Sequence, residues 1–383
     1  MHQHSSLSSL NEKLSRVSQN LRKSATLPPQ CYADESITEV ELARLFDQSW
    51  ISVGRTDRWT SSGSYSTLNI GTTPIIIIRN NDNDLKAFAN SCRHRGSTLL
   101  QGDGDCKKIR CPFHCWTYDL NGKLIFTPRM ECDENFQHSD YPLIEFRLDT
   151  SDGFLFINMD GSAPDLTSWL GDFSKTMLPW DMRSLASTRV REFDVDCNWK
   201  TFIEVFNEYY HLPYVHPSSL NWLYPEPDGT DDVEGNFTSQ FGETNGNAGL
   251  LPDDQNHALP SAPQLKGREL NGTRYTWVYP NLTFATAPDT MWMYETFPIA
   301  ANKTRIIQTI CFPKQSVEAD DFETKAQHYY NRFDEALAED IPFLEQQQKG
   351  LSSKYAQQGQ FSVLEPSVAN FAYWYANKLK DLI

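Results

Sequence analysis

The sequence has no long hydrophobic segment. Its 383 residues contain no apolar run that approaches the roughly 20 residues of a membrane-spanning helix. They also lack the short apolar core that marks a secretory signal peptide. These absences argue against a membrane-embedded protein, and we expect a cytoplasmic one.

Positive charge is scarce as well. The chain has 34 Lys and Arg residues against 50 Asp and Glu residues, which gives a formal net charge of −16. The field of such a surface repels polyanions and mildly favours cations. We therefore expect no nucleic-acid partner.

Two further absences limit the chemistry. No G-x-G-x-x-G fingerprint follows a strand-like segment, so neither a flavin nor a nicotinamide site is indicated in this chain. The eight cysteines are spread through a long chain, and this distribution does not indicate a disulfide scaffold.

The N-terminal segment has two interpretations. Residues 1–30 are rich in Ser and poor in acidic residues, as in a transit peptide, but apolar side chains recur there at helical spacing. This spacing favours a docking helix, and a second helix is expected over 38–46. The apolar residues of the first helix are Leu7, Leu10, Leu14, Val17 and Leu21.

The rest of the chain favours two domains, since one domain usually holds roughly 100 to 200 residues. Segments 74–79 and 85–89 predict a β-hairpin, and 153–158 predicts another strand of a compact β domain. From 221 to 272 the chain is dense in Gly, Pro, Asn and Asp, which predicts a long loop or lid. Three strand-like segments then precede a helical C-terminal stretch: 275–279, 291–294 and 305–312.

Residues 92–115 contain a two-part ligand pattern. It reads Cys-x-His, sixteen intervening residues, then Cys-x-x-His. Two thiolates can hold one iron of a 2Fe-2S cluster while two neutral imidazoles hold the other. Each half lies on a turn rich in Gly or Pro, so both loops can close over a cluster from a β scaffold. The predicted ligands are Cys92, His94, Cys111 and His114.

A zinc site is the alternative for these residues, because two cysteines and two histidines also suit tetrahedral zinc. Zinc modules usually place paired cysteines in one half and paired histidines in the other, whereas each half here supplies one of each. The spacing therefore favours the iron cluster. Cys106 and Cys115 break the pattern, and we interpret them as thiols that pack.

A second constellation lies in residues 198–217. His211 and His216 are five residues apart, and Glu208 precedes the first by three. On a helix, Glu208 and His211 share one face. His216 would point about 140° away on a regular helix, so both rings can face one metal only where the helix ends. We predict that Pro213 breaks the helix.

Two histidines and a carboxylate form the facial triad of ferrous oxygenases. The best candidate for the carboxylate lies further along the chain, at Asp340. Phe333, Leu337, Asp340 and Leu344 follow the 4-3-4 spacing of one helical stripe. A carboxylate on an apolar stripe is costly to bury unless it is paired or bound to a metal, which favours Asp340 over Glu339.

These motifs resemble those of the Rieske non-haem iron oxygenases, the family of aromatic-ring-hydroxylating dioxygenase α subunits. The resemblance extends from residue 50 to residue 350. In this family the second cluster loop usually reads Cys-Pro-Tyr/Phe-His-Gly-Trp, and Cys115 stands at the usual glycine. No cysteine follows His94 as a disulfide partner, unlike in high-potential respiratory Rieske proteins, so we expect a potential toward the lower end of the Rieske range.

The resemblance implies an α+β fold. A Rieske β-sandwich domain would cover 46–160, and a catalytic domain with a curved antiparallel sheet flanked by helices would cover 161–383. N-terminal helices over 1–45 would pack on the catalytic domain.

The same resemblance implies cofactors, roles and partners. Cys92, His94, Cys111 and His114 would hold the 2Fe-2S cluster, and a mononuclear Fe(II) would be bound by three further residues. Glu208 occupies the place of a catalytic bridging carboxylate, more often Asp, that links the metal sites of neighbouring subunits in a homotrimer. A separate NAD(P)H-dependent flavin and iron–sulfur reductase would supply electrons for O₂. The implied ligands of the mononuclear iron are His211, His216 and Asp340.

The substrate is less constrained. The family includes aromatic-ring dioxygenases and monooxygenases that act on choline, betaine or carnitine-like compounds. Glu208 and several aromatic residues favour a small quaternary ammonium substrate, and aromatic-ring hydroxylation stays open. A Rieske electron-transfer protein is an alternative of another class, with about two irons per chain instead of about three. The aromatic residues are Tyr209, Trp277, Trp292 and Tyr294.

Overall fold

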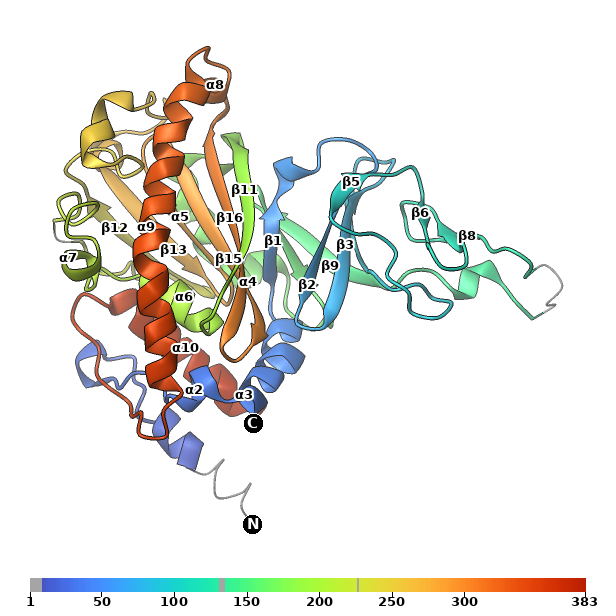
Figure 1. Cartoon of the computed structure of the whole chain (residues 1–383), viewed down its shortest axis with the longest axis horizontal. Helices are drawn as coiled ribbons and strands as arrows, with labels where there is room; N and C mark the ends of the chain where they lie inside the picture. The colour runs from blue at the N-terminus through green and yellow to red at the C-terminus, as the bar shows by residue number, and fades with distance from the viewer. Residues whose placement is uncertain (1–8, 131–134, 226) are drawn as a thin grey trace. The chain divides into compact units, whose positions relative to one another are not determined.

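The structure is a computed structural model that describes residues 9–130, 135–225 and 227–383 (Figure 1). The chain forms two compact units, one over Phe46–Ala163 and one that joins Met1–Leu45 to Pro164–Ile383. Among the described residues, every helix is too short or too polar to span a lipid bilayer. Leu7 of the expected docking helix and Cys132 lie outside the described residues. Residues 9–14 are helical, and Leu10 and Leu14 are buried.

The smaller unit is built on antiparallel strands. A seven-stranded sheet has the order β1-β10-β9-β4-β3-β2-β5, and a three-stranded sheet has the order β6-β7-β8. The predicted hairpin is confirmed, since β3 and β4 pair with Ile77 opposite Ala87. The strands are β1 (Ile51–Arg55), β2 (Ser64–Ile70), β3 (Thr73–Arg79), β4 (Leu85–Ala89), β5 (Asp103–Asp105), β6 (Ile109–Arg110), β7 (Thr117–Tyr118), β8 (Leu124–Phe126), β9 (Glu145–Ser151) and β10 (Phe154–Asn158).

The larger unit contains a six-stranded antiparallel sheet with the order β11-β16-β15-β14-β13-β12. Its longest ladder pairs β11 with β16, from Leu185 opposite Pro313 to Val195 opposite Thr304. Together with the smaller unit, this sheet confirms the α+β fold class. The strands are β11 (Leu185–Val195), β12 (Phe237–Glu243), β13 (Gly272–Val278), β14 (Leu282–Thr286), β15 (Met291–Ala300) and β16 (Lys303–Pro313).

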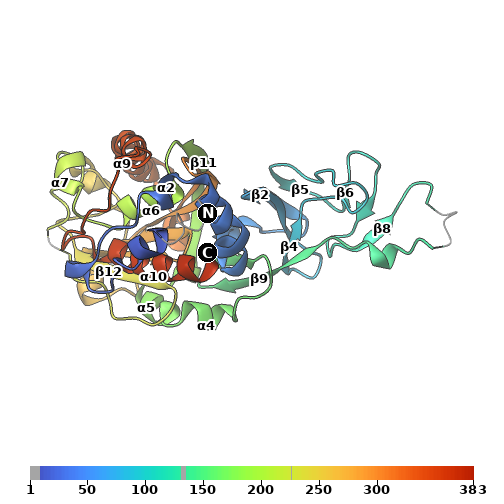
Figure 2. The same ribbon diagram turned by 90° about the horizontal axis from the view of Figure 1, so that it is seen from below.

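Helices complete this unit. The short helix α6 packs against both β15 and the long helix α9, and Trp199 of α6 contacts the rings of Phe371 and Tyr375 on α10. Figure 2 shows α6 between α9 and α10. The helices are α2 (Gln30–Ala33), α3 (Glu35–Val40), α4 (Leu166–Leu170), α5 (Phe173–Met177), α6 (Trp199–Phe206), α7 (Leu212–Val215), α8 (Lys314–Val317), α9 (Phe322–Leu351) and α10 (Pro366–Leu382).

The predicted loop over 221–272 was wrong in part, because it contains strand β12. This strand has no apolar alternation, yet Phe237 to Gly242 are all buried. Its polar side chains are satisfied inside the fold: Ser239 Oγ lies 3.0 Å from Thr276 Oγ1, and Gln240 donates to the carbonyl of Asp228 at 2.6 Å. Internal hydrogen bonds therefore replace the hydrophobic pattern that would have indicated a strand.

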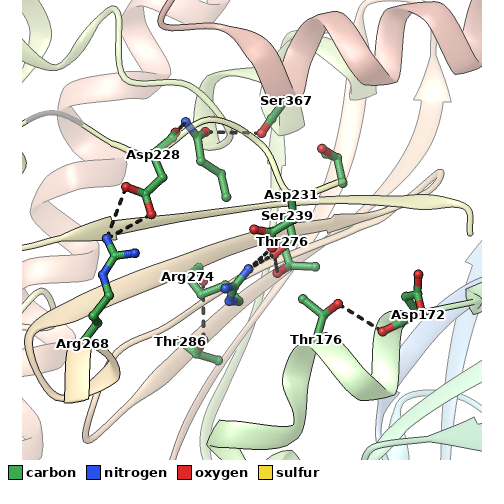
Figure 3. A network of polar contacts seen from close by, with 12 residues as sticks. Asp172, Thr176, Asp228, Asp231, Ser239, Arg268, Arg274, Thr276, Thr286 and Ser367 are labelled. Carbon is green, nitrogen blue, oxygen red and sulfur yellow. Dashed lines mark hydrogen bonds and ion pairs between the residues drawn. The ribbon is translucent and has the colours of Figure 1, made fainter. Parts of the chain in front are cut away.

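The segment before β12 is attached to the sheet by a polar network (Figure 3). The backbone N–H of Asp231 donates to Ser239 O at 2.8 Å. Arg274 of β13 forms an ion pair with Asp231 and donates to Ser239 Oγ at 2.9 Å. Arg268 pairs with Asp228 at 3.0 Å. The part of the expected lid that lies beside β12 is thus held down by charged contacts.

The N-terminal segment is joined to the core by a buried ion pair. The predicted helix over 38–46 is present as α3 followed by a π-helical segment, Glu41–Phe46. Glu41 accepts a hydrogen bond from Lys200 Nζ at 2.6 Å, and both side chains are fully buried. The same carboxylate accepts hydrogen bonds from Trp199 Nε1 at 2.9 Å and from the Tyr375 hydroxyl. One carboxylate therefore connects the N-terminal segment with α6 and α10.

We predict that Lys200→Met lowers the free energy of unfolding by about 3–5 kcal/mol, because it leaves the Glu41 carboxylate buried without its cation. Glu41→Gln combined with Lys200→Met should restore most of this loss. Urea denaturation followed by tryptophan fluorescence measures both. As a control, Lys325→Met removes a partly exposed pair with Asp321 at 3.0 Å and should cost less than about 1 kcal/mol. Equal losses in the two single variants would contradict the assignment.

Candidate metal centres

Two loops of the smaller unit carry the predicted cluster residues. The first follows β4 and holds Cys92 and His94; the second joins β6 to β7 and holds Cys111 and His114. The thiol-bearing residues are buried, whereas both histidines are only half-buried. His94 and His114 have ring centroids 4.7 Å apart at 80°. The structure therefore brings the two imidazoles together at the rim and keeps the two thiols below the surface.

The two loops share one backbone frame. In the first, Cys92 N donates to Ser97 O at 2.9 Å and Gly96 N donates to Cys92 O at 2.8 Å. In the second, Cys111 N donates to the carbonyl of residue 116 at 2.8 Å, and Cys115 N donates to Cys111 O at 3.1 Å. Gly96 and Cys115 are equivalent in this frame, and both have a left-handed backbone, with φ of 74° and 61°.

This equivalence explains the usual glycine at position 115. A residue with a side chain is strained by about 1–2 kcal/mol in the left-handed region, whereas glycine is not. Cys115 adopts this conformation because the hydrogen bonds of the loop enforce it. Cys115 therefore carries a side chain at a position where the left-handed backbone favours glycine. The positions of the four predicted ligand residues are unaffected.

The donor atoms fit a two-iron cluster. Burial, with the nearby charges of His114 and Arg95, lowers the pKa of His94 and favours the neutral imidazole that binds metals. Burial alone would raise the pKa of the Cys111 thiol, but the backbone N–H groups of His114 and Phe113 stabilise the thiolate and the pKa is lowered. His94 Nδ1 is buried with no hydrogen-bond partner among the described residues, as expected of an atom reserved for a metal.

Zinc fits these residues poorly. A tetrahedral zinc ion would bring four donors to within about 4 Å of one another, given bonds of about 2.0–2.3 Å. Over the described residues, no three of Cys92, His94, Cys111 and His114 place ligand atoms within 4.8 Å of one another. A cluster with one iron at the thiols and another at the imidazoles spans the wider separation.

The second constellation begins where α6 ends. The predicted break at Pro213 was wrong: the helix ends at Phe206, and Pro213 lies in the first turn of α7, where its missing N–H is harmless. Asn207 ends the helix, because its side-chain amide donates to Ile203 O at 2.7 Å and to Thr283 Oγ1 at 2.9 Å. Glu208 and His211 therefore lie on the connection between two helices.

Three of the predicted residues converge. His211, His216 and Asp340 place ligand atoms within 4.8 Å of one another. Asp340 Oδ1 lies 3.0 Å from His216 Nε2 and 3.7 Å from His211 Nε2. Donors about 2.1 Å from an octahedral ion and 90° apart would be about 3 Å from each other. The buried Asp340 Oδ1 has no hydrogen-bond partner among the described residues, so the set fits a mononuclear ion on one face.

Each histidine of this set has its own outer carboxylate. Glu208 Oε1 lies 2.6 Å from His211 Nδ1, and Glu339 Oε2 lies 2.6 Å from His216 Nδ1. Ser219 also donates to Glu339 at 2.6 Å. A carboxylate at Nδ1 keeps the proton there and leaves Nε2 free to bind a metal. Sequence reasoning treated Glu339 only as the rejected ligand and missed this role.

Charge at the site favours this arrangement. Burial alone would lower the pKa of His211, but the hydrogen bond and charge of Glu208, with the charge of Asp340, outweigh it, and the pKa is raised. Burial raises the pKa of Glu365, and the negative charge of nearby Glu208 raises it further. The site is therefore rich in negative charge, as expected where a divalent cation would bind.

A second group of possible metal ligands consists of Asp254, His257 and His328. Its two imidazoles are stacked face to face, with centroids 3.7 Å apart and planes at 10°. A coordinated ion lies in the plane of each imidazole, so parallel stacked rings cannot share one without turning. The rings of His211 and His216 meet at 71° instead, which suits a shared ion.

A cavity opens on the group formed by His211, His216 and Asp340. Its wall includes Tyr209, Trp292 and Tyr294, as expected from the sequence. Trp277, the fourth aromatic residue considered, is a core residue instead, fully buried and stacked on Phe371 with ring centroids 3.9 Å apart. Arg332 also lines the cavity, although nothing in the sequence pattern distinguished it.

Comparison with known proteins identifies the class. Residues 182–381 match the family described as the ring hydroxylating alpha subunit (catalytic domain), and residues 49–145 match the Rieske [2Fe-2S] domain. The chain therefore belongs to the ring hydroxylating alpha subunit family. It is an oxidoreductase of the Rieske oxygenase class, whose cofactors are a 2Fe-2S cluster and a mononuclear iron.

Individual relatives are similar over nearly the whole chain. The glycine betaine monooxygenase oxygenase subunit of Pseudomonas aeruginosa is 28% identical, covering 93% of this chain and 89% of the relative. The carnitine monooxygenase oxygenase subunit of Escherichia coli is also 28% identical, covering 94% and 96%. The fold resembles that of a quaternary ammonium Rieske monooxygenase, with a TM-score of 0.82 at 24% identity, over 96% of this chain and 98% of that one.

We predict that Asp340→Ala loses the mononuclear iron and keeps the cluster, because two imidazoles alone form a weak ferrous site. Glu339→Ala should keep the iron but weaken its binding about 10- to 100-fold, since it releases the ring of His216. Anaerobic iron titration and the visible spectrum of the cluster measure both effects. Glu335→Ala, an exposed carboxylate on the same helix, is the control. An Asp340→Ala protein that retains its iron would refute the assignment.

Proposed function

We propose that the chain is the oxygenase subunit of a system that hydroxylates, N-demethylates or cleaves a small quaternary ammonium compound with O₂. A separate NAD(P)H-dependent reductase supplies the electrons. The aromatic cavity beside His211, His216 and Asp340 carries this proposal. The names of the relatives similar over nearly the whole chain support it.

The cavity offers ring faces on several sides. Phe206 lies 5.0 Å from Tyr294 at 73° and 5.2 Å from Tyr275 at 58°, between ring centroids. Tyr275 lies 6.1 Å from Trp292 at 87°. Rings at such angles present faces in different directions around one space. A quaternary ammonium group has no N–H donor, and aromatic faces bind it by cation–π attraction.

The proposed ligands are Cys92 and Cys111 for one iron of the cluster, His94 and His114 for the other, and His211, His216 and Asp340 for the mononuclear iron. When bound, the mononuclear iron supplies the centre that activates O₂ and the cluster supplies electrons one at a time.

The chain's own residues prepare this site. Glu208 and Glu339 hold the protons on the Nδ1 atoms of the two histidines. Leu337 and Leu344 line the cavity beside Asp340 and keep water from the reacting carbon.

We further propose a homotrimer in which Glu208 of one subunit meets His114 of the next. Exposed aromatic side chains flank both residues: Tyr210 and Tyr214 beside Glu208 are 51% and 74% exposed, and Phe113 beside His114 is 59% exposed. Large exposed aromatics of this kind are typical of surfaces that become buried in an assembly. Glu208 would then connect two imidazoles that belong to different subunits.

We predict that the iron-loaded protein, with NADH and a generic reductase of this class, oxidises quaternary ammonium compounds and not aromatic acids, because the cavity favours a cation. The measurement is mass spectrometry of products from a panel of choline, glycine betaine, carnitine and benzoate-type acids. His211→Ala is the inactive control. Ring-hydroxylated products from the aromatic acids alone would refute the proposed substrate.

We predict that Glu208→Gln retains both metal sites and the trimer but loses at least about 100-fold in turnover. The amide is nearly isosteric, yet its single oxygen cannot accept hydrogen bonds from the ring N–H groups of two imidazoles as a carboxylate does. Single-turnover oxidation of the pre-reduced cluster, with substrate and O₂ present, measures the coupling. Normal cluster oxidation would exclude the bridging role, and loss of the mononuclear iron would make Glu208 a ligand instead. Glu335→Gln is the matched control.

A further inference from the structure

Arg332 is a buried cation in the wall of the cavity. It lies on α9 and is only 3% exposed. Among the described residues, no carboxylate lies within 4.0 Å of its guanidinium, and its Nε has no hydrogen-bond partner. Arg332 precedes Asp340 by about two helical turns on the same helix. The cavity therefore has a positive charge in its wall at a distance from the triad.

Aromatic side chains surround this guanidinium. Its carbon lies 5.1 Å from the ring centroids of both Trp292 and Phe333. The positive charge of the guanidinium also influences the hydroxyls of Tyr224 and Tyr275, whose oxygens lie 2.6 Å from each other. Burial raises the pKa of both tyrosines, and the positive charge of Arg332 only partly opposes this effect. Both hydroxyls stay protonated, and because one of them donates to the other, one O–H remains for a further acceptor beside the arginine.

Stacking alone does not balance the charge. Burial of an unpaired ion is costly even after the protein relaxes, and a cation–π contact offsets only part of this cost. Arg189 of the same unit shows the usual solution, since it donates to the Asp334 carboxylate through two nitrogens at 3.1 and 2.5 Å. Arg332 has no such partner among the described residues, so an anion in the cavity would complete its environment.

We propose that Arg332 anchors the carboxylate of a zwitterionic substrate, so that the enzyme acts on carboxylate-bearing quaternary ammonium compounds in preference to uncharged or purely cationic analogues. This inference rests on the proposed function and narrows its substrate class. The guanidinium offers two parallel N–H donors to a carboxylate, and the hydroxyl of Tyr275, which also lines the cavity, offers a further donor when Tyr224 donates to it. The aromatic rings then hold the trimethylammonium end.

The test uses the iron-loaded enzyme with its reductase and two matched substrates, 4-(trimethylammonio)butyrate and its methyl ester. They differ in the negative charge, and both carry the same cation. We expect wild type to prefer the acid by about 100-fold in kcat/KM. Arg332→Gln should raise KM for the acid about 100-fold, change kcat by less than about threefold and abolish the preference. Arg332→Lys should keep part of it, because the charge remains without the paired donors.

Several outcomes would contradict the binding of the substrate carboxylate by Arg332 while leaving the proposed function intact. One is a wild-type enzyme that oxidises acid and ester equally; another is an Arg332→Gln variant that loses both substrates in parallel with a normal cluster spectrum. If Arg332→Gln does not fold, Arg332→Lys decides. An unchanged preference for the acid in this variant would contradict the role of Arg332, and so would a complete loss of the preference together with a lower kcat. Failure of wild type to oxidise either compound refutes the proposed function itself. Arg305→Gln on β16, which breaks a pair with Asp194 on β11, is the matched control and should keep the preference.

Discussion

The position of α6 is the constraint on which the mononuclear site depends. The helix begins with the buried pair of Lys200 and Glu41, and it ends at Asn207, which is hydrogen-bonded to the sheet at Thr283. Gln348 of α9 accepts a hydrogen bond from Asn198 N at 2.9 Å, at the cap of the same helix. Two histidines that follow α6 thus meet an aspartate on α9, because both helices are fixed by polar contacts that would be costly to leave half-made.

Three carboxylates near the histidines differ in task because they differ in surroundings. Asp340 faces both Nε2 atoms with an oxygen that has no other partner among the described residues. Glu208 and Glu339 face the opposite ring nitrogens at 2.6 Å and are engaged by hydrogen bonds. Residue type alone would not separate these roles, since all three are acids. The distances to the two sides of each imidazole do separate them.

Much of the architecture was predictable from the sequence, and the failures have physical causes. The cluster residues and Asp340 stood out because thiols, imidazoles and a carboxylate on an apolar stripe are unusual at those spacings. The helix end at Phe206 was missed because it depends on tertiary hydrogen bonds of Asn207, whereas Pro213 has the stronger local signal. Strand β12 was missed because its polar side chains are paired inside the fold. Arg332 was missed because the lack of a carboxylate partner among the described residues can be seen only in three dimensions.

The common frame of the two predicted cluster loops would give a bound cluster a defined orientation. The same two backbone hydrogen bonds hold each loop, so the side-chain types alone decide which end of the cluster faces outward. Buried thiols stand at one end and half-exposed imidazoles at the other. A cluster held by these residues would have its imidazole-bound side next to the solvent-facing rim, where a partner surface could approach the edges of the His94 and His114 rings. Four side chains on two equivalent turns would thus decide which end of the cluster faces solvent.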